Sequence, residues 1–308
     1  MDLYSFPLAY RGLTLNEHRT AAGALDATKE ADTIRVDRFD FSRLQQRDQR
    51  EPLNLLTGGD LGDASPTFRY LSLAGMVKGS NGMKLSDKIA ALLAAFNVEE
   101  AQLASPTTVG LLPLTFTDVT EVNTGRGTAW TDPTQSGQSG YYVVERFLAR
   151  PAGWPIITQR RSGGDSAGFA LELVCADPRR YIDTAESVVL NSGNGFSASC
   201  PNWNTTQGWA VPPTLTIVTS ANGSATFTFA IADGIADLVL NLSAVGAATI
   251  VVDCAAGTIK IGSTHRADLR TSVVDSLFKR VPRGGATAAA SNTTNVTSVT
   301  LAYRQARG

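Results

Sequence analysis

The residue types that most often carry out catalysis are few in this chain, and their spacing does not suit a shared task. The two histidines, His18 and His265, lie far apart, and neither has a second His, Cys or carboxylate at the spacing of a zinc ligand set. A Ser-His-Asp hydrolase needs its serine on a strained turn, and no G-x-S-x-G sequence is present to form one. The sequence therefore predicts neither a metal site nor a nucleophilic enzyme.

Two carboxylate pairs are the remaining candidates for acid-base chemistry: Asp233 with Asp237, and Asp253 with Asp268. A glycoside hydrolase holds two carboxylates at a defined separation, which the sequence does not give. Aspartate is also frequent in the turns at strand ends, and this is its more common role. We expect turn-forming aspartates here, and a glycoside hydrolase with a β-sandwich accessory domain stays open as an alternative.

The segment Gly58-Gly59-Asp60-Leu61-Gly62-Asp63 has the glycines of a phosphate-binding loop, but it lacks the spacing and the lysine of one. Its aspartates would also repel a phosphate, and their positions do not match a calcium-binding loop. We interpret it as a flexible connection. The three cysteines, Cys175, Cys200 and Cys254, follow no C-x-x-C spacing, and an odd number cannot all pair within one chain. We expect reduced, buried thiols and no cofactor.

The length of 308 residues exceeds the range in which a single core usually keeps growing, so two domains are expected. The seam between them is Cys175 to Tyr181, because mixed helix and strand patterns precede it and short alternating strands follow it. This places the domains at residues 1–182 and 183–308. The 27 basic and 28 acidic residues give a net charge of -1, so no overall field attracts nucleic acid or an anionic membrane.

The first residues show no sign of an export signal. Met1 to Ser5 carries an acid where a signal peptide has basic residues, and no apolar region follows. The most apolar stretch, Leu238 to Val252, contains Asn241 and is flanked by aspartates, so it falls short of a bilayer span. We predict a chain made in the cytoplasm, with no signal peptide and no membrane insertion.

The N-terminal domain is predicted to combine strands with one amphipathic helix. The helix is Ser86 to Phe96, with Ser86 as its N-cap and one apolar stripe of Ile89, Leu92, Leu93 and Phe96. Alternating apolar residues predict strands at Tyr4 to Leu15, Thr33 to Phe41, Arg69 to Val77, Leu112 to Val122, Tyr141 to Leu148 and Phe169 to Val174. The polar segment Asn123 to Gly140, which contains Trp130, is expected to be a mobile loop that orders against a neighbouring subunit.

The C-terminal domain shows the shortest and most regular strands. They are expected at Thr184 to Leu190 and around the apolar pairs and triplets of residues 215–217, 225–231, 238–242, 250–252, 259–261 and 299–303, with a hairpin turn at Asp253 to Gly257. This spacing is typical of sandwiches and jelly rolls. A loop is expected at Asn191 to Gly208, and it carries Trp203 close to Trp209. These flat rings could stack on a sugar, although tryptophans at a domain entry more often plug a core.

In this order, the elements resemble the distal tail protein, Dit, of long-tailed siphophages. The resemblance rests on the strand that ends Gly75-Met76-Val77-Lys78-Gly79-Ser80 before the helix, on the segment Asp177-Pro178-Arg179-Arg180-Tyr181, and on the hairpin Ile250 to Ile259 with the last strand Val299 to Arg304. The chain departs from compact members by extra length at Arg43 to Pro66 and Asn123 to Gly140. The fold that the resemblance implies is mainly β (α+β): an N-terminal split β-barrel or sandwich, then a galectin-like jelly-roll sandwich.

The resemblance also implies a structural virion protein without enzymatic activity. In that family the N-terminal domains close into a six-membered ring that joins the tail tube to the tail-tip or baseplate proteins and lets DNA pass, and the galectin-like domains project outward. On this basis Trp130, Asp177, Arg179, Arg180 and Tyr181 are candidates for ring or domain-junction contacts. The alternative is a carbohydrate- or receptor-binding tail protein that uses Trp203 and Trp209 on a host-surface glycan.

Overall fold

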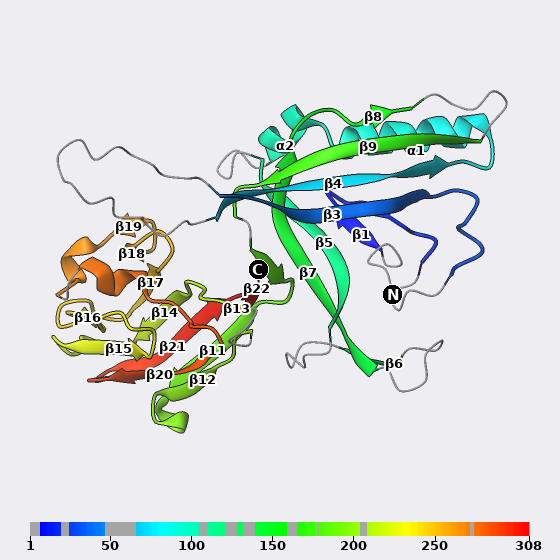
Figure 1. The fold of residues 1–308 in the computed structure, drawn as a ribbon. Coiled ribbons are helices and arrows are strands. Elements are labelled where there is room, and N and C mark those ends of the chain that lie inside the picture. Colours follow the sequence, from blue (N-terminus) through cyan, green and yellow to red (C-terminus); the bar gives the residue numbers. More distant parts are fainter. Residues whose placement is uncertain are drawn as a thin grey trace, which may run out of the picture. The chain divides into compact units, whose positions relative to one another are not determined.

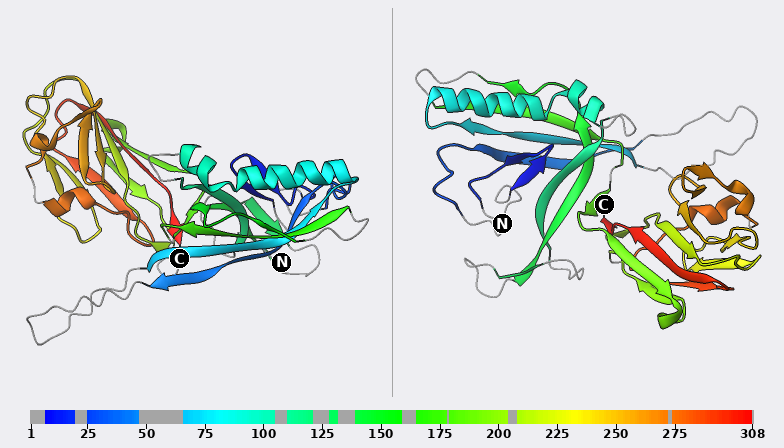
Figure 2. Two further views of the ribbon diagram at one scale, coloured as in Figure 1. Left: turned by 90° about the horizontal axis from the view of Figure 1, so that it is seen from above. Right: turned by 180° about the vertical axis from the view of Figure 1, so that it is seen from behind.

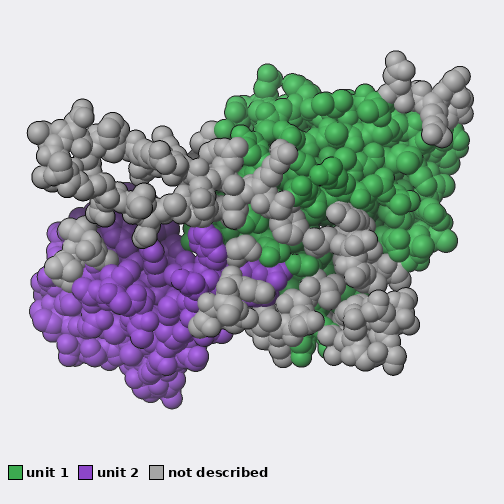
Figure 3. Space-filling model, in the orientation of Figure 1, with its two compact units in different colours: residues 1–180 green, residues 181–308 purple. Residues whose placement is uncertain are grey.

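The computed structural model describes residues 7–19, 25–46, 66–104, 110–120, 128–131, 139–158, 165–177, 179–203, 208–271 and 274–307. The chain divides into two compact units, residues 1–180 and 181–308, which Figure 3 shows in different colours. Each unit has its own cluster of buried apolar side chains. The structure is mainly β and its sheets are antiparallel, which confirms the predicted fold class.

The strands of unit 1 belong to one continuous hydrogen-bonded network with two branches, which we call its two sheets, and the long strand β7 takes part in both (Figure 1). The first has the order β8, β9, β4, β3, with bounds β3 Ile34–Gln46, β4 Pro66–Lys78, β8 Ile156–Ile157 and β9 Ser166–Cys175. The second has the order β2, β1, β5, β7, β6, with bounds β1 Leu8–Tyr10, β2 Leu13–Leu15, β5 Leu112–Thr120, β6 Thr128–Thr131 and β7 Ser139–Pro151. The last residues of β7 pair with β9, so β7 passes from one sheet to the other.

One strand prediction and one loop prediction for unit 1 need correction. The segment Tyr4 to Leu15 does not form one strand in its described part, because Arg11 and Gly12 both have positive φ and turn the chain into the β1–β2 hairpin. The predicted loop Asn123 to Gly140 contains β6, which pairs with the start of β7. The rest of that loop, the segment Gly58 to Asp63 and most of the extra length at Arg43 to Pro66 lie outside the described residues.

The predicted helix is present as α1, Gly82–Ala95, but it begins one turn earlier than the sequence suggested. Asn81 is the N-cap in place of Ser86, since its side-chain oxygen accepts hydrogen bonds from two free N–H groups of the first turn at 3.1 and 2.9 Å. Leu92 and Phe96 of the expected stripe are buried, and the Phe96 ring stacks on Tyr10 with centroids 4.8 Å apart. Figure 2 shows α1 along one face of the sheet that contains β4 and β9.

A second helix, α2 at Val98–Ala104, was not predicted, because seven residues are too few to show a helical period. Asn97 precedes it and accepts hydrogen bonds from the N–H groups of Glu99 and Glu100. Neither helix in the described part of the chain is long and apolar enough to span a membrane.

Unit 2 is a sandwich of two antiparallel sheets around one apolar cluster. The larger sheet has the order β11 Glu186–Asn191, β21 Val296–Tyr303, β14 Thr214–Thr219, β17 Ala248–Asp253, β18 Thr258–Ile261 and β19 Thr264–His265. The smaller has the order β12 Ser197–Cys200, β20 Ala286–Ser291, β15 Phe227–Ile231 and β16 Leu238–Leu240. Shorter elements are β10 Arg180–Ile182, β13 Gly208–Trp209, β22 Ala306–Arg307 and the 3-10 helices Ser192–Asn194 (η3), Ala267–Leu269 (η4) and Val274–Phe278 (η5).

The strands predicted from alternating apolar residues in unit 2 are confirmed, and so is the hairpin turn between β17 and β18. The carboxylate of Asp253 organises this turn by accepting the N–H groups of Ala255 and Ala256 at 2.9 and 3.0 Å. The expected loop Asn191 to Gly208 is wrong in part, because it contains β12. The sequence also gave no sign of β20, whose Ala-Thr-Ala-Ala-Ala-Ser sequence carries too little apolar contrast to mark a strand.

A buried ion pair lies in the interior of unit 2. Lys279 is fully buried, and its Nζ donates hydrogen bonds to Oδ1 of Asp233 at 2.9 Å and to the carbonyl oxygens of Ile235 and Ile231 at 2.9 and 3.4 Å. The Asp233 carboxylate also accepts the N–H groups of Ile235 and Arg280. These contacts tie the β15–β16 connection to the segment that follows η5.

The three cysteines are free and buried, as predicted. Burial raises the pKa of the thiols of Cys175, Cys200 and Cys254 to about 12, about 11 and about 12, respectively. At neutral pH all three are therefore protonated and behave as small apolar side chains.

Candidate functional site

The surface of interest is the outer face of the β8-β9-β4-β3 sheet in unit 1, the face turned away from the apolar core. In an antiparallel sheet, residues directly opposite each other project from the same face. One such row runs across four strands: Arg38 of β3, Ala74 of β4, Ala170 of β9 and Ile156 of β8. The side chains in the middle of this row are therefore short, and those at its two ends are long.

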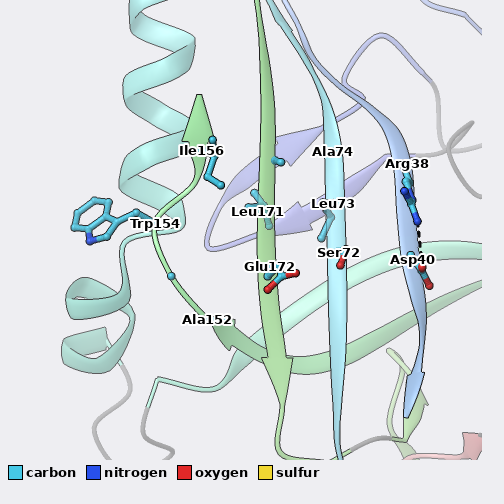
Figure 4. Close-up of a pocket in the computed structure, with 12 residues that line it drawn as sticks. Arg38, Asp40, Ser72, Leu73, Ala74, Ala152, Trp154, Ile156, Leu171 and Glu172 are labelled. Carbon is cyan, nitrogen blue, oxygen red and sulfur yellow. Dashed lines mark ion pairs between the residues drawn. The ribbon is translucent and has the colours of Figure 1, made fainter. Parts of the chain in front are cut away.

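The next row on this face repeats the pattern, with Asp40 opposite Ser72 and Ser72 opposite Glu172. Small side chains at the centre and longer ones at the margins create a hollow of about 470 Å³, which we call the sheet trough (Figure 4). Its lining comprises Arg38, Asp40, Ser72, Leu73, Ala74, Ala152, Gly153, Trp154, Ile156, Ala170, Leu171 and Glu172. The trough is thus a direct result of residue size at paired positions.

One margin of the sheet trough is apolar and exposed. Trp154 and Ile156, in the short segment that leads into and forms β8, are 60% and 67% exposed. Exposed apolar side chains are common one at a time, and these two form a small apolar margin beside a concave surface.

The opposite margin is charged but internally balanced. Arg38 Nη2 lies 3.6 Å from Oδ2 of Asp40, and Arg35 Nε lies 2.6 Å from Oδ1 of Asp37 on the same strand. These pairs are largely exposed, so each adds little stability. Their effect is to cancel charge along β3, which leaves this margin polar without a strong field.

A bulge in β3 shapes the same face. The pairing of β3 with β4 shifts between Val36 and Arg38, and the β3 backbone comes so close to Gly75 that a Cβ there would clash with the carbonyl of Arg35. Only glycine fits at such a close approach of two backbones. This bulge sets which β3 side chains project into the trough.

The candidate residues at the seam form contacts within the chain. Arg179 makes a two-pronged pair with Asp177, both distances being 2.7 Å, and Arg180 lies 3.1 Å from Asp118 and 3.4 Å from the buried Glu145. Tyr181 packs against the apolar cluster of unit 2. Their proposed role in contacts between subunits stays a prediction.

The tryptophans chosen from the sequence occupy three different settings. Trp203 is 1% exposed, and the guanidinium of Arg307 lies 4.7 Å from its ring centre, so it offers no face to a sugar. Trp209 is half-buried against the apolar core of unit 2. Trp130 lies in β6 opposite Gly140. The structure does not bring Trp203 and Trp209 together as an exposed stacking platform.

The candidate acids and histidines have structural contacts. Asp233 pairs with the buried Lys279, Asp253 caps a turn and Asp268 pairs with Arg266 at 2.8 Å. His18 is buried 3.3 Å from the hydroxyl of Thr33, and burial lowers its pKa, which keeps it neutral. Over the described ranges, no three His, Cys, Asp or Glu side chains cluster in a way that could hold a metal ion.

Sequence reasoning missed the trough residues. Trp154 and Ile156 stand in Gly153-Trp154-Pro155-Ile156, a short apolar segment whose exposure cannot be read from its letters. The usable signal was the run of small residues on one face of β4 and β9, which the alternation of Leu71, Ser72, Leu73 and Ala74 already contains.

Neither a family model nor a curated protein sequence matches this chain. Among solved structures, the chain is similar to the crystal structure of the SPP1 Dit protein (gp 19.1), described as a paradigm of the hub adsorption apparatus in phages that infect Gram-positive bacteria. The TM-score is 0.55 at 12% sequence identity, over 97% of this chain and 98% of that chain. At this identity the likeness shows a shared fold across both units, which confirms the predicted resemblance at the level of the fold.

Proposed function

We propose that this chain is a structural virion protein, the distal tail (hub) protein of a long-tailed phage, and that it works without catalysis. The observation that carries the proposal is the whole-chain likeness to the Dit hub protein, which includes both units and their order. A shared fold alone does not fix function. The sheet trough supports the proposal, because it is a concave surface with exposed apolar side chains at one margin.

In this proposal the N-terminal domain, residues 1–182, closes into a homohexameric ring that joins the tail tube to the tail-tip proteins. A ring needs two different and complementary patches on each copy. The sheet trough with Trp154 and Ile156 supplies one of them. The exposed Met83 of α1 and Leu103 of α2 are apolar side chains on convex helices, suited to enter a neighbour's trough.

The charge balance of the chain fits the passage of DNA through such a ring. A strongly basic lumen would bind phosphate groups through counterion release and hold the DNA in place. The net charge of -1 and the paired charges along β3 avoid this. The C-terminal domain, residues 183–308, is proposed to be galectin-like and to project outward.

The test of assembly is direct. We expect the purified protein to form closed rings in negative-stain images, and mass photometry to show a species of six copies of the 32.5 kDa chain, about 195 kDa together. A protein that remains a monomer at high concentration, with no rings on the grid, would refute the proposal.

The role of the trough is tested with a matched pair of variants. The double change Trp154→Ser and Ile156→Ser removes two exposed side chains, so the fold should persist while the ring species is lost. The control Val189→Ser removes an exposed apolar side chain of unit 2 and should leave assembly unchanged. Rings that survive the double change would exclude the trough as a contact without excluding the hub role.

A further inference from the structure

Unit 2 contains a small hollow between β18, β19 and the 3-10 segments η4 and η5, which lie near one another in Figure 1. Its volume is about 190 Å³, and its lining includes Thr258, Ile259, His265, Ala267, Arg270 and Leu277. Drug-sized ligands occupy pockets of about 300 Å³ or more, so this hollow suits a ligand no larger than a single sugar ring. We call it the cationic pocket.

The polar side chains around the cationic pocket are mainly basic. Arg270 is a half-buried residue, and it forms no ion pair with another described residue. His265 pairs directly with Lys260 across the β18–β19 ladder, so both side chains project from one face. The acid of η4, Asp268, is already held by Arg266 through contacts of 2.9 and 2.8 Å. Within the described part of unit 2, Arg270 therefore has no acidic partner.

The backbone that carries Arg270 is held in place. Its N–H donates to the carbonyl of Ala267 at 3.2 Å, and the next N–H, of Thr271, donates to Val239 of β16 at 3.0 Å. Leu269, the residue before it, is buried in the core of the unit. The backbone at Arg270 is therefore already ordered before a ligand binds, which lowers the entropy cost of binding.

An aromatic ring lies beside Gly257, one of the residues that line the pocket. Phe278 is partly exposed, and the tip of its ring is so near that a Cβ at Gly257 would come within 2.8 Å of it. Gly257 has a φ of 63°, and it also lines the pocket. An arginine without an acidic partner among the described residues, the hydroxyl of Thr258 and a nearby aromatic ring are chemically suited to an anionic sugar.

We propose that the cationic pocket binds a monosaccharide-sized anion, a sugar that carries a carboxylate or a phosphate group. Arg270 binds the anionic group with its planar fork of N–H donors. His265 and Thr258 donate further hydrogen bonds, and the ring of Phe278 packs on the apolar face of the sugar. This site differs from the Trp203 and Trp209 pair, and it does not depend on assembly into a ring.

The test uses four probes on the full chain, followed by calorimetry or by amide chemical shifts: glucuronate, glucose 1-phosphate, inorganic phosphate and glucose. We expect saturable binding of at least one of the two sugar acids and at least tenfold weaker binding of glucose and of inorganic phosphate. The two sugar acids distinguish a carboxylate ligand from a phosphate ligand. The proposal is overturned if neither sugar acid binds, or if glucose binds as tightly as the sugar acids. Binding of inorganic phosphate as tight as that of the sugar acids would overturn the claim that the ligand is a sugar.

The variant Arg270→Gln should weaken binding of the sugar acid at least tenfold, since it removes the charge and the fork of N–H donors while it leaves a polar side chain. The matched control is Arg283→Gln, an exposed arginine of the same unit that does not line the pocket. The variant Thr258→Ala provides a second measurement if Arg270→Gln is poorly folded. Equal loss in Arg270→Gln and Arg283→Gln, or no loss in either pocket variant, would show binding by general surface charge and refute the site.

Discussion

Replacement of Lys279 by methionine should destabilise unit 2 strongly. The lysine Nζ is fully buried and donates three hydrogen bonds, one of them to the equally buried Asp233 at 2.9 Å. Removal of one partner from a buried ion pair costs about 3–5 kcal/mol, because the other charge is left without compensation. Asp233 keeps two backbone N–H donors, of Ile235 and Arg280, so we expect the lower end of this range, about 3 kcal/mol.

Hydrogen exchange is the suitable assay, because it reports each unit separately. A loss of about 3 kcal/mol corresponds to about a hundredfold faster exchange of the slowest amides in β14, β15 and β17, with no change in β4 and β9. The control is Lys88→Met, which removes a pair with Glu17 of the same 2.9 Å length whose side chains are about a quarter exposed. That variant should cost at most about 1 kcal/mol in unit 1.

The double variant Asp233→Asn with Lys279→Met distinguishes the energy of the ion pair from the contacts that each side chain makes with other residues. It should be less destabilised than the sum of the single variants, because no uncompensated charge remains. If Lys279→Met speeds exchange in unit 2 by less than about fivefold, a loss of under about 1 kcal/mol, the argument from the buried charge is wrong.

Three further outcomes follow from unit 1. Gly75→Ala should cost about 1–3 kcal/mol in denaturant unfolding, because its Cβ would clash with the β3 backbone, whereas Gly82→Ala, with open space around it, should not destabilise. Asn81→Ala should cost about 1 kcal/mol through loss of the α1 cap. The hydrogen bond from Lys84 lowers the pKa of Asp32 to about 2, so its stabilisation is complete above the unfolded pKa and is lost as the pH falls through about 2. The melting temperature of Asp32→Asn should therefore lie below that of the wild type near pH 7 and converge with it below pH 2; a constant difference would contradict the assignment.

Much of the fold could be predicted from local patterns, because each confirmed strand alternates apolar and polar residues. Phe39, Leu71 and Leu171 are buried in the core, and each belongs to an alternating pattern that is visible in the sequence. The apolar stripe of α1 is visible in the same way. The failures occur where local chemistry is ambiguous. Asn81 and Ser86 both have side chains that can cap a helix, and only the path of the chain after β4 selects Asn81.

The candidate sites were harder to predict, since burial and exposure are properties of the assembled fold. Tryptophan is a residue type that often stacks on sugars, which made Trp203 a candidate. In the fold, the guanidinium of Arg307, over a hundred positions later in the sequence, lies over its ring. Trp154 showed no periodic pattern, and its exposure depends on the short edge strand β8. The trough needs four strands in register, and no single strand reveals it.

The protonated state of the cysteines has a practical meaning for handling the protein. Exchange between thiols and disulfides starts from a thiolate, and Cys175, Cys200 and Cys254 provide almost none while the chain is folded. Aerated buffer should therefore neither cross-link copies nor create mixed species.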